Sequence, residues 1–142
     1  VPVVPRGSGT SLSGGAIPIA GGLVLSLAKF KRILSVDAYS RTAVVQPGVR
    51  NLAISEAAAP HNLYYAPDPS SQIACSIGGN VAENSGGVHC LKYGLTVHNV
   101  LRVRAVTMEG DVVVFGSEAP DAPGLDLLAT LIGSEGMLAV AT

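Results

Sequence analysis

The sequence predicts a mixed α+β fold, because short strand signals and short helix signals alternate along the chain. Runs rich in valine, isoleucine and leucine are bounded by glycine, proline, asparagine or aspartate, which is typical of strands that end in turns. Segments rich in glycine and serine separate these runs and predict loops. Together the patterns indicate strands that pair with sequence neighbours and also through crossover connections.

The first third of the chain predicts four strands. Residues 1–4 are β-branched and interrupted by proline, so they predict the end of a strand that runs into a turn. Residues 23–27, 33–37 and 42–46 are the next apolar runs. The short turn at residues 38–41 predicts that the last two of these strands form a hairpin.

The middle of the chain predicts two helices around an irregular stretch. Residues 51–59 predict a helix with Asn51 as its N-cap and Pro60 as its stop. Residues 61–71 show no period and predict irregular structure. A second helix is predicted over residues 77–82, although its two glycines lower the helix propensity.

The last third returns to strands. Residues 100–107 and 112–115 predict two strands joined by a turn at 109–111. Residues 126–132 predict a short helix, and residues 138–142 predict a final strand. The chain begins without Met and ends inside an apolar run, so we expect a fragment that is truncated at both ends.

Composition and charge exclude several classes of function. Only 13% of the residues are charged and the formal net charge is −1, which argues against nucleic acid as a partner. The longest apolar stretch, residues 16–28, is interrupted by proline and glycine and is too short for a transmembrane segment. The two cysteines form no CxxC pair and no metal-site spacing, so we expect reduced thiols in a cytoplasmic protein and no metal site.

Three glycine-rich segments predict a phosphate-binding function. Residues 6–15, 76–87 and 133–136 combine glycines with hydroxyl side chains, so their backbone N–H groups can approach an anion closely. Arg6 is the only cation of the first loop, so neutral donors would hold most of a bound phosphate. The Rossmann fingerprint fails because Leu12 stands where a glycine is needed, and no P-loop string occurs. The pattern favours a flat cofactor that carries a diphosphate.

Several strings resemble, in order, the loops of one known family. These are residues 5–15 (PRGSGTSLSGG), 67–71 (PDPSS), 77–87 (IGGNVAENSGG) and 133–136 (GSEG). They resemble the vanillyl-alcohol-oxidase-type, or PCMH-type, FAD-binding domain. Longer strings at 45–55, 59–69 and 87–99 are similar to the branch of this family that contains the FAD-linked subunits of bacterial glycolate oxidases.

The resemblance implies a fold and a domain organisation. FAD would lie extended between two α+β lobes, the first over about residues 1–60 and the second over about residues 61–142. The C-terminal substrate domain of the family would be absent from this chain.

The resemblance also implies which residues hold the cofactor. The first loop would bind the diphosphate, the second lobe would enclose the flavin and diphosphate, and the last loop and strand would lie near the adenosine. The implied cofactor-binding residues are Arg6, Gly7, Ser8, Gly9, Thr10, Ser11, Ser13, Pro67, Asp68, Pro69, Ser70, Ser71, Ser76, Gly78, Gly79, Asn80, Asn84, Gly86, Gly87, Tyr93, Glu135 and Val140.

Each assignment has a structural alternative. The loop glycines could serve turn geometry alone, Asn84 could be a helix C-cap, and Glu135 could be a solvated charge. Tyr93 could be an ordinary packing residue. Some members of the family link the flavin covalently through a histidine at the place of Ser8, so we expect non-covalent FAD here.

The implied activity is the oxidation of a small 2-hydroxy acid, with glycolate converted to glyoxylate by hydride transfer to flavin N5. D-lactate or D-2-hydroxyglutarate dehydrogenation is an alternative, as is an assembly module that no longer binds flavin. The family's base and substrate clamp lie largely in the absent domain, so we assign no catalytic residue and expect no turnover by this chain alone. The resemblance implies partner subunits of flavoprotein-like and iron–sulfur type, in the cytoplasm or peripherally at the inner membrane.

Overall fold

The computed structural model describes residues 1–121 and 123–142, whose strands form three small sheets. Strands β1 (Val3–Arg6) and β2 (Leu23–Ser26) pair in parallel. Strands β3 (Ile33–Asp37) and β4 (Thr42–Val45) form an antiparallel hairpin. The third sheet has the order β6-β5-β7, and both of its strand pairs are antiparallel. Its strands are β5 (Arg102–Thr107), β6 (Val112–Gly116) and β7 (Ala139–Ala141). This mixture confirms the predicted α+β class.

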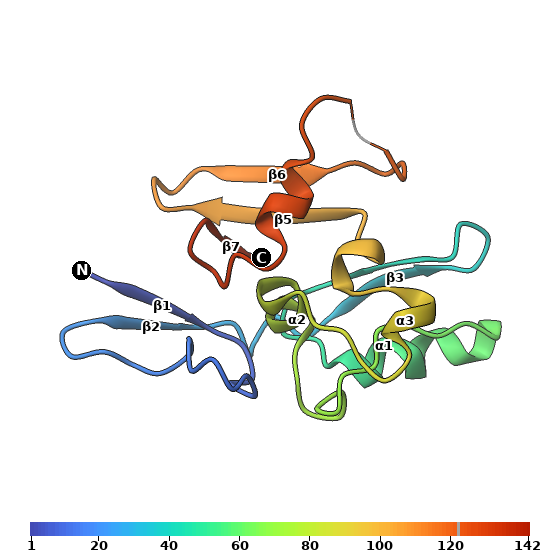
Figure 1. Ribbon diagram of the computed structural model, residues 1–142, viewed down its shortest axis with the longest axis horizontal. Coiled ribbons are helices and arrows are strands. Elements are labelled where there is room, and N and C mark those ends of the chain that lie inside the picture. Colours follow the sequence, from blue (N-terminus) through green and yellow to red (C-terminus); the bar gives the residue numbers. More distant parts are fainter. Residues whose placement is uncertain (122) are drawn as a thin grey trace.

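Four short α-helices connect the sheets in the described part of the chain (Figure 1). They are α1 (Asn51–Ala58), α2 (Ile77–Glu83), α3 (Cys90–Tyr93) and α4 (Leu127–Leu131). Two 3₁₀ turns, Ala59–His61 and Thr96–His98, follow α1 and α3. The sequence predicted α1, α2 and α4 within about two residues at their ends, which is the usual variation of helix boundaries. It did not predict α3 or the second 3₁₀ turn, because residues 90–98 carry no apolar period.

The predicted N-cap role of Asn51 is wrong. Helix α1 begins at Asn51, and Arg50 occupies the N-cap position in an extended conformation. The first helical amides need no side-chain cap, because the N–H of Asn51 donates to the Cys75 carbonyl and that of Leu52 to the Gln72 carbonyl, each at 3.0 Å. The Asn51 side chain is instead fully buried, and its Nδ2 donates to the carbonyl of Pro67 at 3.0 Å.

Helix α2 lies among the three sheets and is bonded to its surroundings at both ends (Figure 1). At its beginning, Ile77 N–H donates to Val49 O and Gly78 N–H donates to Pro47 O, both at 2.8 Å. At its end, Gly133 N–H donates to Val81 O at 2.9 Å. Segments from distant parts of the sequence are therefore attached to one short helix.

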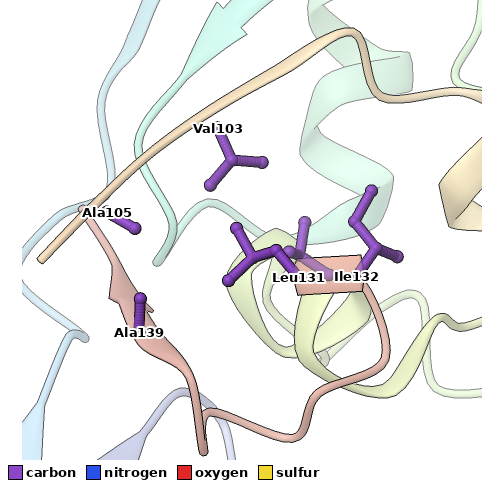
Figure 2. Close-up of a cluster of buried hydrophobic side chains, with 6 residues drawn as sticks. Val103, Ala105, Leu131, Ile132 and Ala139 are labelled. Atoms are coloured by element: carbon purple, nitrogen blue, oxygen red, sulfur yellow. The ribbon is translucent and has the colours of Figure 1, made fainter. Parts of the chain in front are cut away.

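Two hydrophobic clusters support this arrangement. In the first, side chains from β5, β7 and the α4 region converge: Val103, Ala105, Leu131, Ile132 and Ala139 (Figure 2). Val81 of α2 belongs to the same cluster.

The second cluster contains Val49, Ile54 and Ile77, with Ile33 and Tyr65 packed against it. Helix α1 therefore packs on residues from both sides of position 60, where the sequence placed the boundary between two lobes. Among the described residues, no helix is both long and apolar enough to cross a bilayer.

Leu131 tests the first cluster. This side chain is 3% exposed, whereas Leu127 on the same helix is 54% exposed. We expect Leu131→Ala to lower the free energy of unfolding by about 2–5 kcal/mol, because it removes buried methyl groups and leaves a cavity. Leu127→Ala is the control and should change it by less than about 0.5 kcal/mol. Urea unfolding measures both, and equal effects would contradict the packing described here.

Two adjacent glycines test how helix α2 packs against Pro47. A Cβ on Gly78 would lie 2.7 Å from Cβ of Pro47, whereas a Cβ on Gly79 would meet only Ser76 Oγ, at 3.4 Å. We expect Gly78→Ala to lower the free energy of unfolding by about 1–3 kcal/mol through overpacking. Gly79→Ala should be neutral or raise it by up to about 1 kcal/mol, because alanine favours the helix. The same urea measurement applies, and a destabilised Gly79→Ala protein would be the contrary outcome.

Candidate cofactor-binding site

A cavity lies between strand β1 with its following loop, helix α2 and the segment that enters β7. It brings together most of the first loop, the beginning of α2 and the end of the chain, which are far apart in sequence. The predicted site residues that line it are Arg6, Gly7, Ser8, Gly9, Thr10, Ser11, Ser71, Ser76, Gly78, Gly79, Asn80, Glu135 and Val140.

The first loop approaches helix α2 closely at Gly7. A Cβ on Gly7 would collide with Oγ of Ser76, so a larger residue at position 7 would force the Ser76 hydroxyl to move. The Arg6 side chain folds over the same loop, because a Cβ on Gly9 would lie 3.2 Å from Arg6 Nη2. Arg6 forms no ion pair with any described carboxylate, which leaves its charge available to an anion. The loop thus offers backbone donors, hydroxyls and one cation to the cavity.

Ser13 anchors the loop from outside the cavity. Its Oγ donates to Oε1 of Glu83 at 2.7 Å, which ties the far end of the loop to the end of α2. Glu83 itself lines the cavity. The predicted contact of Ser13 with the cofactor therefore remains a prediction, and its observed contact is with the helix.

Two buried polar atoms in the cavity wall lack partners among the described residues. They are Oγ of Ser76 and Nδ2 of Asn80, on side chains that are each 2% exposed. An unsatisfied buried polar group costs about 1–3 kcal/mol, so such groups in a cavity wall call for a ligand or water. Both offer hydrogen-bond donors. The cavity therefore fits a cofactor with acceptor oxygens, such as the diphosphate and ribityl oxygens of FAD.

The 133–136 segment, which lines the cavity on a third side, is hydrogen-bonded to the end of helix α2. Gly133 N–H donates to Val81 O and Glu135 N–H donates to Ala82 O, both at 2.9 Å. Glu135 adopts a positive φ of 55° and is exposed at the cavity rim, so its carboxylate can accept from ribose hydroxyls.

The remaining predicted residues lie outside this cavity. Asn84 is the C-cap of α2 in the left-handed conformation, as the structural alternative predicted, and its Oδ1 accepts from the Val97 N–H at 3.0 Å. Gly86 and Gly87 pack tightly, the first against Leu95 and Cys90 and the second against Asp68. The cavity lining also excludes Pro67, Asp68, Pro69, Ser70 and Tyr93.

Sequence reasoning missed several cavity residues. Cys75, Ser85 and Pro47 line the cavity. Ser85 stands inside the string that carried the resemblance, so its hydroxyl was a usable signal. Pro47 and Cys75 carry no recognisable signal, because their positions depend on how β4 and the 71–76 segment pack on helix α2.

Comparisons with known proteins show which family the chain belongs to. A protein family described as "FAD binding domain" matches residues 1–116. Glycolate oxidase subunit GlcD of Escherichia coli strain K12 is 68% identical over 142 residues, which cover all of this chain and 28% of that protein. D-lactate dehydrogenase of Archaeoglobus fulgidus is 43% identical over 143 residues, which cover this chain fully and 32% of that protein.

A solved structure supports the fold. Alkyldihydroxyacetonephosphate synthase superposes with a TM-score of 0.85 and 24% identity, over 99% of this chain and 26% of that one. The chain thus spans about a third or less of the length of the proteins it matches. Because the family match extends over most of the chain, the protein belongs to the FAD-binding domain family.

Proposed function

We propose that this chain is the FAD-binding part of a 2-hydroxy-acid oxidoreductase, with glycolate as its substrate and FAD held non-covalently. The cavity supports the proposal, because its buried orphan donors at Ser76 and Asn80 fit a cofactor rich in acceptor oxygens. The 68% identity to a glycolate oxidase subunit favours glycolate over other acids.

The residues of this chain would bind and orient the cofactor. Bound FAD supplies a two-electron acceptor for oxidation of the carbinol carbon. Arg6 and the amides of the first loop would neutralise and fix the diphosphate. Ser76 and Asn80, whose side chains are buried, would donate to cofactor oxygens. Ser8 stands where other members carry a linking histidine, which supports non-covalent attachment.

Assembly and alternatives follow from the same relatives. The name of the E. coli relative describes a subunit, so we propose that the full-length protein assembles with other subunits, of flavoprotein-like and iron–sulfur type. We propose cytoplasmic localisation, with contact to the inner membrane only through such partners.

D-lactate is an alternative substrate, because a D-lactate dehydrogenase is a relative at 43% identity, and D-2-hydroxyglutarate is another alternative. An assembly module without flavin is disfavoured by the unsatisfied donors in the cavity.

Flavin content tests the cofactor assignment. We expect the purified full-length protein to be yellow and to release its flavin on acid precipitation. Gly79→Ala should weaken FAD binding about tenfold or more, equivalent to about 1.4 kcal/mol, because Gly79 lines the cavity and its added methyl would lie beside Ser76 Oγ, one of the proposed donors to the cofactor. Titration of the apoprotein with FAD measures this effect. Flavin that stays with the precipitated protein would contradict non-covalent binding.

Anaerobic flavin reduction tests the substrate. We expect glycolate to reduce the flavin of the full-length protein with a higher kcat/KM than D-lactate or D-2-hydroxyglutarate. The 142-residue chain alone should not turn over glycolate, because the family resemblance implies that the base and substrate clamp come largely from a further domain. Glyoxylate formation by the isolated chain with FAD and a dye acceptor would overturn this expectation.

A further inference from the structure

Helix α1 holds an irregular segment, residues 67–75, that lies further along the chain. The structure assigns neither helix nor strand to these residues. The N–H of Leu52, in the first turn of the helix, donates to the Gln72 carbonyl at 3.0 Å. Nη1 of Arg50 donates to the Ile73 carbonyl at 3.3 Å. Contacts with the helix, rather than regular structure of its own, therefore set the course of the segment.

One residue of the helix, Asn51, bonds both ends of this segment. Its side-chain Nδ2 donates to the Pro67 carbonyl, and its backbone N–H donates to the Cys75 carbonyl, each at 3.0 Å. A carbonyl oxygen can only accept, so the side-chain group that faces Pro67 is the NH₂ group. The side chains of Asn51 and Pro67 are both fully buried, so the bond between them is shielded from water.

The segment that Asn51 closes carries part of the cofactor cavity. Ser71 and Cys75 line the cavity, and Ser76, which also lines it, directly follows the segment. Oγ of Ser76 is one of the two buried donors without a partner in the cavity wall. A change in the course of residues 67–75 would therefore displace one wall of the cavity.

Packing alone does not account for an amide at position 51. Oδ1 of Asn51 has no hydrogen-bond partner among the described residues. An unsatisfied buried acceptor is unfavourable, and an apolar side chain of similar volume would avoid it. The amide is explained by its Nδ2, because this atom is the donor that the buried Pro67 carbonyl receives.

We propose that Asn51 is a positioning residue for the cofactor. Through its bond to the Pro67 carbonyl it holds residues 67–75 in the course that places Ser71 and Ser76 at the cavity. Asn51 does not line the cavity itself, so it acts through this segment. The inference rests on the proposed function and deepens it, because it adds to the cofactor site a residue that makes no contact with the cofactor.

The FAD affinity of the full-length apoprotein tests the role of the Asn51 side chain. Asn51→Leu keeps the volume about the same but cannot donate, so we expect the Kd for FAD to rise about tenfold or more. In Asn51→Asp the carboxyl donates to Pro67 only when it is protonated, and burial raises the pKa of such a carboxyl. Its Kd should lie within about threefold of wild type at about pH 5 and about tenfold or more above wild type at about pH 9.

Ile54→Val is the matched control. Ile54 lies on the same helix, is 6% exposed and packs in the second cluster, and it does not line the cavity. The substitution weakens the packing of the helix but leaves its bonds to residues 67–75 in place. Circular dichroism confirms that each protein is folded during the titration. The loss of stability alone should then leave the Kd within about twofold of wild type.

Alkylation of Cys75 in the apoprotein is a readout that needs no bound FAD. Cys75 is 4% exposed, so iodoacetamide reaches its thiol only when the segment opens. We expect Asn51→Leu to speed the labelling of this thiol about tenfold, and Ile54→Val to leave the rate within about twofold. Mass spectrometry of the peptide that contains Cys75 measures both rates.

Three results would overturn the proposal: a wild-type Kd in Asn51→Leu, an Asn51→Asp Kd that follows wild type at both pH values, or an equal loss of affinity in Ile54→Val. If Asn51→Leu does not fold, the two pH values of Asn51→Asp decide.

The thiol readout separates this test from that of the proposed function. If the wild-type protein takes up no FAD, the cofactor assignment is wrong. Faster labelling of Cys75 in Asn51→Leu would then still support the role of Asn51 in holding the cavity wall, and an unchanged rate would reject it.

Discussion

The arrangement of the site depends on the backbone bonds that hold helix α2. A helix of seven residues is marginal by itself, so its position is set by its partners rather than by its own propensity. Carbonyls of Pro47 and Val49 accept from its first amides, and carbonyls of Val81 and Ala82 accept from the 133–135 turn. Pro47 can approach only because residue 78 is glycine. One short element thereby fixes the relative position of β4, α1 and the end of the chain.

This arrangement explains how a chain with few charges can hold a dianionic cofactor. Only 13% of the residues are charged, and Arg6 is the only cation that lines the cavity among the described residues. Close approach of Gly7 to Ser76 places the loop amides beside the start of the helix. Before a ligand binds, a buried backbone or hydroxyl donor without a partner costs much less free energy than a buried cation without a partner. Glycine and serine are accordingly the residues that the cavity needs.

Much of the fold could be predicted from the sequence, because its signals are local. Valine-rich runs marked the β3–β4 and β5–β6 hairpins, and the glycine-serine loops marked most of the cavity. The predictions failed where a residue's role depends on tertiary contacts. Asn51 has a typical capping side chain, yet carbonyls from residues 72 and 75 satisfy the helix amides, and the side chain turns inward to Pro67. Neither Cys75 in the cavity nor the His89–Asp68 contact across 21 residues leaves a mark in local sequence.

The family resemblance implied that the string at residues 67–71 encloses the flavin and diphosphate and that Asn84, Gly86, Gly87 and Tyr93, in the string at residues 84–93, lie near the flavin, whereas only Ser71 of these residues lines the cofactor cavity. Asp68 and Tyr93 instead line a second hollow, together with His89. Gly87 packs directly on Asp68, so the two strings form one wall. Because Asp68 also accepts from the His89 backbone N–H at 3.3 Å, the position of one string fixes the position of the other.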